Sequence, residues 1–230
     1  MDIQTEDDGA AVARAGAEFV ARAARAAVAA RGVFHFAVSG GHTPWEMMRE
    51  LVGGDLAWDK VHLFQVDERI APAGDPDRNL THLRASLLAF VAIPDGQVHA
   101  MPVEASDADA AAAQYERELA VTGKPAVLDL IHLGLGPDGH TASLVPGDPV
   151  LEVRDRDVAV TGTAYQGRRR MTLTYPAIGR AREVLWLIDG AGKADMLARL
   201  VAGDQTIPAG RVRTAHSTAI VDKQAAAKLG

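Results

Sequence analysis

The sequence predicts an α/β fold, in which a doubly wound, mainly parallel sheet carries helices on both faces. Segments with strand patterns and segments with helix patterns alternate through most of the chain, which is typical of this class. The run over residues 128–133 has the composition of a buried strand. Neither a fixed-period repeat nor a clear linker interrupts the 230 residues, so we expect a single α/β domain over residues 1–230.

The predicted elements follow one another in order. An alanine-rich segment, residues 9–32, has strong helix propensity and ends on a glycine. A β-branched and aromatic run, residues 33–39, predicts a strand that the glycines and proline of residues 40–44 end. Residues 150–169 are rich in charge and glycine and predict a mobile loop or a hairpin. The remaining predictions are helix 45–54, strand 60–66 closing on residues 67–69, helix 77–90, helix 107–123, strand 127–134, strand 171–175, strand 183–189, helix 193–203, strand 217–222 and a short helix over 223–230.

Composition and charge exclude several classes of protein. The chain has no cysteine, which excludes disulfides, thiolate metal sites and a cysteine nucleophile. A formal net charge of −6 argues against broad nucleic-acid binding, although a few well-placed cations can still form a pocket for a small anion. The acidic start "MDIQTEDDGA" lacks the pattern of a signal peptide, and no apolar run approaches the ~18 residues of a membrane span. We therefore expect a cytoplasmic protein with no nucleic-acid or membrane partner.

Four loops are predicted at the edge of the sheet where open α/β folds bind ligands, beyond the carboxyl ends of the strands. They are "SGGHTP", "VDER", "GLGPDGHTAS" and "DGAGK". In the first, Gly40 and Gly41 precede a helix N-terminus, where backbone N–H groups bind anions, and Thr43 adds a hydroxyl. The alternative interpretation is a tight turn capped by Thr43, with Pro44 in the first helical position.

Cations accompany the other loops. Arg69 follows Asp67 in "VDER", and its planar guanidinium suits a phosphate or carboxylate, although a solvated ion pair is the simpler alternative. Lys193 lies near the start of a helix, where the helix dipole opposes a cation unless an anionic ligand binds there. Arg170 is the last of three consecutive arginines and points into the site if it begins the next strand.

The glycine-rich loop over residues 134–140 allows three interpretations. It spells the GxGxxG of a dinucleotide site, but Pro146 and Pro149 stop the long helix that this site requires. It also resembles a phosphate loop, but His140 stands in place of the lysine. Proton transfer fits best, because histidine titrates nearest neutral pH and Asp138, two residues earlier, can orient its ring.

The other histidines are weaker signals. His35, His62, His99 and His132 fall within or beside predicted strands, where we expect hydrogen-bonded residues of the sheet. There is no HExxH motif and no two-histidine metal spacing. The sequence therefore predicts neither a metal nor another cofactor.

These motifs, in this order, resemble the glucosamine-6-phosphate isomerase/6-phosphogluconolactonase family. The resemblance rests on "SGGHTP", "VDER", "LGLGPDGHTASLVPG", "RMTLTYP" and "GAGK", and it runs over about residues 36–193. It implies a fold similar to glucosamine-6-phosphate deaminase and, more distantly, to ribose-5-phosphate isomerase. It also implies that His140 is the catalytic base with Asp138 as its carboxylate partner. The substrate-binding residues that it implies are Gly40, Gly41, Thr43, Asp67, Arg69, Arg170 and Lys193.

Two departures from the family pattern bear on the activity. His42 stands where the family usually has a small residue, often serine, so one hydroxyl contact is lost. Val145 stands where the family's deaminases carry a glutamate, so ring opening and deamination lack a component. The resemblance therefore implies hydrolysis of 6-phospho-D-glucono-1,5-lactone to 6-phospho-D-gluconate, in the oxidative pentose phosphate pathway. We expect the protein to be a monomer.

Water is the expected nucleophile of this reaction, because neither Ser39 nor Ser143 has the preceding glycine of a GxSxG motif. Two alternatives stay open at this point. One is a sugar-phosphate isomerase or deaminase of the same fold, and the other is a sugar-phosphate sensor without catalytic activity.

Overall fold

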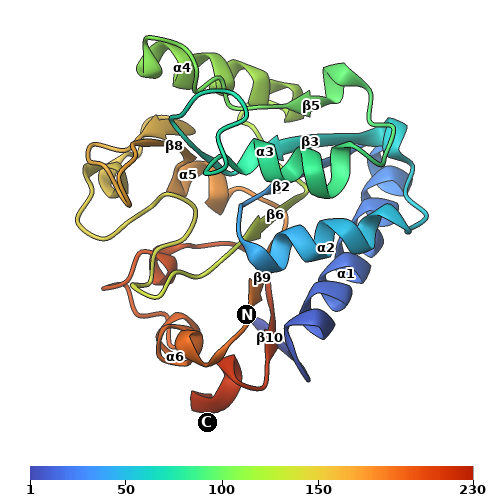
Figure 1. The fold of residues 1–230 in the computed structure, drawn as a ribbon, viewed down its shortest axis with the longest axis vertical. Coiled ribbons are helices and arrows are strands. Elements are labelled where there is room, and N and C mark those ends of the chain that lie inside the picture. Colours follow the sequence, from blue (N-terminus) through green and yellow to red (C-terminus); the bar gives the residue numbers. More distant parts are fainter. Residues whose placement is uncertain (230) are drawn as a thin grey trace.

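The computed structural model describes residues 1–229, and a seven-stranded sheet forms the centre of this part of the chain (Figure 1). The strand order is β1-β10-β9-β6-β2-β3-β5, and every neighbouring pair is parallel. The prediction of a mainly parallel sheet is therefore confirmed. The strands are β1 (Asp2–Glu6), β2 (Phe34–Val38), β3 (Val61–Gln65), β5 (Val98–His99), β6 (Leu130–Leu133), β9 (Val184–Ile188) and β10 (Ser217–Asp222).

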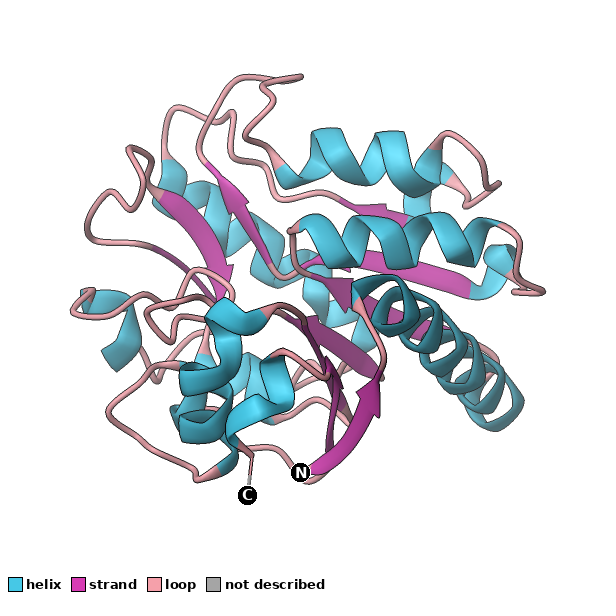
Figure 2. Cartoon of the chain, turned by 60° about the horizontal axis from the view of Figure 1, so that its bottom comes forward, coloured by secondary structure: helices cyan, strands magenta, loops and turns pink. Residues whose placement is uncertain are grey.

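Helices cover both faces of this sheet, as the sequence predicts (Figure 2). One face packs against α1 (Gly9–Arg31), α2 (His42–Val52) and α3 (Asn79–Leu83), and the other against α4 (Ala108–Leu119), α5 (Tyr175–Gly179) and α6 (Ala194–Val201). Neighbouring residues of β9 enter different cores: Leu185 packs with the first group of helices and Trp186 with the second. Burial on both faces explains why the central strands are almost continuously apolar. No helix within residues 1–229 is both long and apolar enough to cross a bilayer.

A second, three-stranded sheet lies beside the main one. It consists of β4 (Asp67–Arg69), β8 (Arg170–Leu173) and β7 (Val158–Val160), in that order and antiparallel. Strands β7 and β8 form the arms of a hairpin, so the hairpin alternative for residues 150–169 is confirmed. The strand predicted over 171–175 begins one residue earlier and belongs to this small sheet, where Arg170 lies directly opposite Arg69.

The first two helices show how local sequence sets their ends. The Asp8 carboxylate accepts a hydrogen bond from the Ala11 N–H at 2.8 Å and caps α1, which ends at Gly32 with a φ of 76°. Helix α2 starts three residues earlier than predicted, with Gly41 as a cap that offers no side chain. The interpretation of Thr43 as a cap before Pro44 is therefore wrong, since both residues lie inside the helix.

Other differences from the sequence prediction are small. The sequence does not predict strand β1, because four of its five residues are polar and the strand is mostly exposed. Strand β5 has two residues, too few for a pattern. The helix predicted over 77–90 is α3 followed by a π-helical turn, Arg84–Leu88. The short helix predicted over 223–230 is a 3-10 turn, Ala225–Lys228, and Gly230 lies outside the described residues.

The sheet histidines are bonded less completely than the sequence suggests. His62 Nδ1 lies 3.0 Å from His99 Nε2, a hydrogen bond as predicted. The prediction is wrong for His132, which is fully buried with both ring nitrogens unpartnered among residues 1–229. The His35 ring lies 3.7 Å from the Asp129 carboxylate, too far for a hydrogen bond. Burial lowers the pKa of all four histidines, to about 4 for His99 and about 3 for His132.

Candidate active site

A cleft of about 350 Å³ opens at the carboxyl ends of β2, β6 and β9. The four predicted ligand loops meet there, together with the tip of the β7–β8 hairpin. Every predicted site residue except Asp138 lines this cleft, and Asp138 contacts His140 from behind it. The predicted residues that line it are Gly40, Gly41, Thr43, Asp67, Arg69, His140, Arg170 and Lys193.

The start of α2 forms one wall of the cleft. A Cβ atom at Gly40 would lie 1.9 Å from Asn79 Oδ1, so only glycine fits at this position. Within residues 1–229 no side chain caps α2, so the N–H groups of His42 and Thr43 in its first turn remain available to an anion. The Thr43 hydroxyl donates to Asp189 Oδ1 at 2.5 Å. His42 stands at the rim with a side chain that is 81% exposed.

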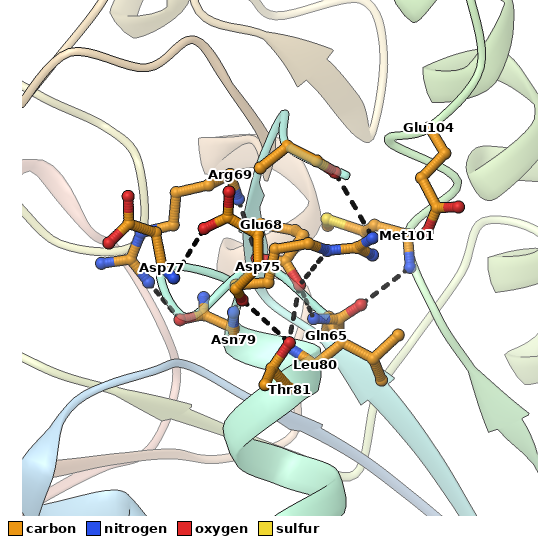
Figure 3. A network of polar contacts seen from close by, with 12 residues as sticks. Gln65, Glu68, Arg69, Asp75, Asp77, Asn79, Leu80, Thr81, Met101 and Glu104 are labelled. Atoms are coloured by element: carbon orange, nitrogen blue, oxygen red, sulfur yellow. Dashed lines mark hydrogen bonds and ion pairs between the residues drawn. The ribbon is translucent and has the colours of Figure 1, made fainter. Parts of the chain in front are cut away.

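The "VDER" segment fixes a second wall through Glu68 (Figure 3). This glutamate is fully buried. Its Oε1 accepts hydrogen bonds from the backbone N–H groups of Arg69 and Asn79, and its Oε2 accepts from that of Leu80, each at 2.8 Å. The carboxylate therefore satisfies the free N–H groups at the start of α3 and ties this helix to β4.

The two neighbours of Glu68 reach the cleft itself. Asp67 Oδ2 accepts a hydrogen bond from the Ser143 hydroxyl at 2.6 Å, which ties β4 to the loop that carries His140. Arg69 donates to Asn79 Oδ1, and this contact holds the guanidinium over the cleft. Asp67 is thus already bonded within the protein, whereas Arg69 retains further donors.

Three cations converge on the cleft without carboxylate partners. Within residues 1–229, neither Arg69, Arg170 nor Lys193 forms an ion pair. Burial and the neighbouring Arg69 lower the pKa of Arg170, and burial lowers that of Lys193 although Asp189 and Asp138 oppose the shift. Arg170 donates to Gln166 Oε1 at 3.0 Å, but its buried Nε has no partner in the described chain. Facing like charges destabilise a strand pair, so this arrangement favours a bound anion.

The Asp138–His140 pair faces these cations. His140 Nδ1 lies 2.6 Å from Asp138 Oδ1, which also accepts the backbone N–H of His140 at 3.1 Å. The hydrogen bond to a carboxylate assigns the proton to Nδ1 and leaves the lone pair of Nε2 for proton transfer. Burial raises the pKa of Asp138, but hydrogen bonds from His140 and Tyr165 outweigh it and hold this pKa below its usual value.

Two glycines of the loop leave room for neighbouring side chains that a Cβ atom would displace. A Cβ atom at Gly136 would lie 2.0 Å from His140 Nδ1, and one at Gly139 would lie 2.6 Å from the Cβ of Ile207. No helix begins within residues 134–148, so the loop lacks the helix that the dinucleotide interpretation needs. The structure of this loop therefore does not support the dinucleotide interpretation.

Some residues of the site are not among those that the sequence predicts. Asp189 ends a predicted strand at the ligand edge, so the strand-end rule points to it. Ser39 has the same signal, and its buried hydroxyl has no partner among the described residues. Tyr165 had no signal, yet its hydroxyl lies 3.1 Å from Asp138 Oδ2. Nowhere in residues 1–229 do three His, Asp or Glu side chains gather closely enough to hold a metal ion.

Comparison with known proteins identifies the family. A family model described as glucosamine-6-phosphate isomerases/6-phosphogluconolactonase matches residues 7–221. The chain belongs to this family. The resemblance inferred from the motifs is therefore confirmed, and it extends beyond residues 36–193 on both sides.

Relatives within the family are similar over nearly the whole chain. A 6-phosphogluconolactonase of Mycobacterium tuberculosis is 42% identical over 97% of this chain and 96% of its own length. The crystal structure of a 6-phosphogluconolactonase from Thermotoga maritima has a TM-score of 0.87 and 28% identity, covering 96% of this chain and 99% of that one. A monomeric glucosamine-6-phosphate deaminase has a TM-score of 0.86 at 18% identity, covering 99% of this chain and 100% of that one. The last match confirms that the deaminases share the fold.

Proposed function

We propose that this protein is a 6-phosphogluconolactonase, which hydrolyses 6-phospho-D-glucono-1,5-lactone to 6-phospho-D-gluconate in the oxidative pentose phosphate pathway. Membership of the family and 42% identity to a 6-phosphogluconolactonase over 97% of the chain support this proposal. The observation that carries it is the pairing, in one cleft, of a carboxylate-bound histidine with three cations that have no carboxylate partner within residues 1–229. A phosphorylated ester substrate needs both a base for water and an anion site.

His140 acts as the general base in this proposal. Its Nε2 takes a proton from water while the water oxygen bonds to the lactone carbonyl carbon. The negative charge of Asp138 stabilises the imidazolium that forms. The carbonyl oxygen carries negative charge in the tetrahedral intermediate and is met by N–H donors of the cleft. When the intermediate collapses, the bond to the ring oxygen breaks, and His140 returns the proton to that oxygen.

The cations hold the other end of the substrate. Arg69 and Lys193 bind the phosphate together with the first-turn N–H groups of α2, and Arg170 assists from β8. This binding energy, far from the reacting carbon, orients the lactone toward His140. Asp67 stays in the proposed substrate-binding set because it lines the cleft, although Ser143 already occupies one of its oxygens.

Val145 favours the lactonase over a deaminase. The side chain at this position is 3% exposed and does not line the cleft. It cannot move a proton, and deamination needs more acid–base groups than lactone opening does. The test is to assay one preparation with 6-phosphogluconolactone and with glucosamine 6-phosphate, subtracting the spontaneous hydrolysis of the lactone. We expect lactone hydrolysis without ammonia release; ammonia release at a comparable rate, or binding of 6-phosphogluconate without turnover, would contradict the proposal.

We further propose that the enzyme acts as a monomer in the cytoplasm, without metal, other cofactor, nucleic acid or membrane. The acidic charge of −6 supports the absence of a nucleic-acid partner. Activity is expected to survive exhaustive chelation and the absence of nucleotides. Loss of activity with a chelator, restored by one metal, would overturn the cofactor part, and a dimer in sedimentation would overturn the monomer.

A further inference from the structure

Tyr165 contacts the Asp138–His140 pair from outside the family motifs. Its hydroxyl lies 3.1 Å from Asp138 Oδ2 and 3.3 Å from His140 Nδ1. The Tyr165 and His140 rings meet edge to face, with centroids 5.1 Å apart. Because His140 bonds Oδ1 and Tyr165 bonds Oδ2, each oxygen of the Asp138 carboxylate has its own donor. A carboxylate held at both oxygens cannot rotate freely about its bond to Cβ.

The backbone around Tyr165 is a tight turn that presents the ring. Tyr165 N–H donates to the Arg168 carbonyl at 2.9 Å, and the Arg168 N–H donates back to the Tyr165 carbonyl at 3.4 Å. The two residues between them, Gln166 and Gly167, have φ angles of 53° and 80°. Positive φ at both central residues is the turn geometry that matches the twist of a hairpin. Tyr165 therefore stands at a defined position at the hairpin tip.

Polar contacts fix both arms of this hairpin close to its tip. At the tip, Arg168 forms ion pairs with Asp75 at 2.9 Å and Asp77 at 3.3 Å, on the loop that follows β4. On the other arm, between β7 and the tip, Asp148 accepts hydrogen bonds from the backbone N–H and the hydroxyl of Thr163, at 2.9 Å and 2.7 Å. The Tyr165 hydroxyl is thus held against Asp138 by the fold and not only by its own hydrogen bond.

The chemistry of Tyr165 suits a permanent donor. Burial and the adjacent Asp138 raise the pKa of Tyr165, so its hydroxyl keeps its proton at neutral pH. The Arg170 guanidinium lies 5.0 Å from the centroid of the ring, a contact that needs the ring but not the hydroxyl. Replacing Tyr165 by phenylalanine therefore removes the donor and leaves this packing in place.

We propose that Tyr165 is a positioning residue: its hydroxyl fixes the Asp138 carboxylate, so that Oδ1 holds the Nδ1 proton of His140 and Nε2 faces the substrate. The kinetic consequence rests on the proposed lactonase function. The structural consequence, a single tautomer of His140, does not.

Tyr165→Phe tests both consequences. We expect kcat for lactone hydrolysis to fall by about 5- to 20-fold, the order expected for a misaligned base, while KM changes less than about twofold. Long-range ¹H–¹⁵N spectra report which ring nitrogen of a histidine carries the proton, and the signals of His140 are those absent from His140→Gln. The wild-type protein should show the Nδ1–H tautomer alone, and Tyr165→Phe a mixture.

Tyr175→Phe is the matched control, because it removes the same atom from a tyrosine that donates to the Pro208 carbonyl at 2.8 Å, outside the cleft. It should change neither kcat nor the tautomer. Tyr165→Phe with wild-type kcat, or with reduced kcat and an unchanged tautomer, would overturn the inference, as would a rise in KM alone. If the wild-type protein does not hydrolyse the lactone, the proposed function fails, and the tautomer alone decides the role of Tyr165.

Discussion

Neighbours, not residue type, distinguish His140 from the other histidines of this chain. His132 is buried without a partner among residues 1–229, and His42 is largely exposed, 3.6 Å from Glu46. His140 combines a carboxylate at 2.6 Å with a place in the cleft wall. The sequence predicts this pair because Asp138 and His140 are two residues apart. The donor from Tyr165 was beyond prediction, because it comes from 25 residues further along the chain.

His140→Gln should lower kcat by about 10²- to 10⁴-fold with little change in KM, because it removes the proposed general base but keeps a polar side chain of similar size. The rate must be corrected for spontaneous hydrolysis of the lactone. His216→Gln makes the same change at an exposed position and should leave kcat unaltered. A His140→Gln variant that retains near wild-type kcat would rule out this residue as the base.

Arg69→Ala and Lys193→Ala should each weaken binding of 6-phosphogluconate by about 10- to 100-fold, the strength of a hydrogen bond to a charged group. Binding of unphosphorylated gluconate should weaken much less, as calorimetry with both ligands can show. Arg199→Ala removes a cation that is already paired with Asp204 and serves as the control. Equal losses for the two ligands would mean that these cations do not bind the phosphate.

At the scale of elements, β4 distributes three adjacent side chains among three tasks: Asp67 bonds the His140 loop, Glu68 caps α3, and Arg69 faces the cleft. The sequence predicts that Arg69 binds the substrate. It predicts the helix over 77–90 but does not indicate that Glu68 caps it, because the partners of Glu68 are backbone groups 11 and 12 residues away. The sheet that a strand joins also depends on residues far away in the sequence, which is why the pairing of β8 with β4 could not be predicted.

Glu68→Gln should lower the free energy of unfolding by about 3–5 kcal/mol, because the amide turns one acceptor into a donor facing backbone N–H groups and leaves the buried Arg78 with less charge compensation. Urea unfolding measures this loss. Glu104→Gln changes a 54% exposed partner of the same Arg78 and should lower stability by less than about 1 kcal/mol. Similar losses in the two variants would show that Glu68 does not hold α3.

At the scale of the whole molecule, two histidines that burial keeps neutral make the folding stability depend on pH. For His132 and His99, the pKa falls from 6.5 in the unfolded chain to about 3 and about 4 in the folded protein. Between these values the unfolded state binds more protons than the folded one. The stability from each neutral histidine is therefore complete above pH 6.5 and declines as the pH falls below it toward the folded-state pKa.

His132→Leu should remove the loss of stability at low pH that comes from this one histidine. We expect the variant to be more stable than the wild type at pH 8, by about 1–2 kcal/mol, since it replaces a buried side chain with unpartnered nitrogens. The advantage should widen as the pH falls from 6.5 toward 4. Urea unfolding of both proteins across this range measures the difference, and parallel profiles would contradict the prediction.

The overall architecture is the most predictable property of this protein. Its prediction needs only the alternation of strand and helix patterns along the chain, and not the exact residues at which each element ends. Helix α1 matches its prediction to within one residue. Charge behaves in the opposite way: a net value of −6 conceals a cleft with three cations. Net charge therefore bears on which kinds of partner the whole protein can bind, whereas the position of the site is indicated only by the loops at the strand ends.

Strand β1 occupies one margin of the main sheet, where β10 is its neighbour. Residues 2–6 pair with residues 218–222, so β1 cannot dock until the strands between them in the chain have been made. Once β10 has been made, its unpaired edge can pair with a strand of another chain until β1 docks. With β1 in place, the edge of the sheet is a short strand of mostly polar, exposed residues, which is a poorer template for another chain than β10 is.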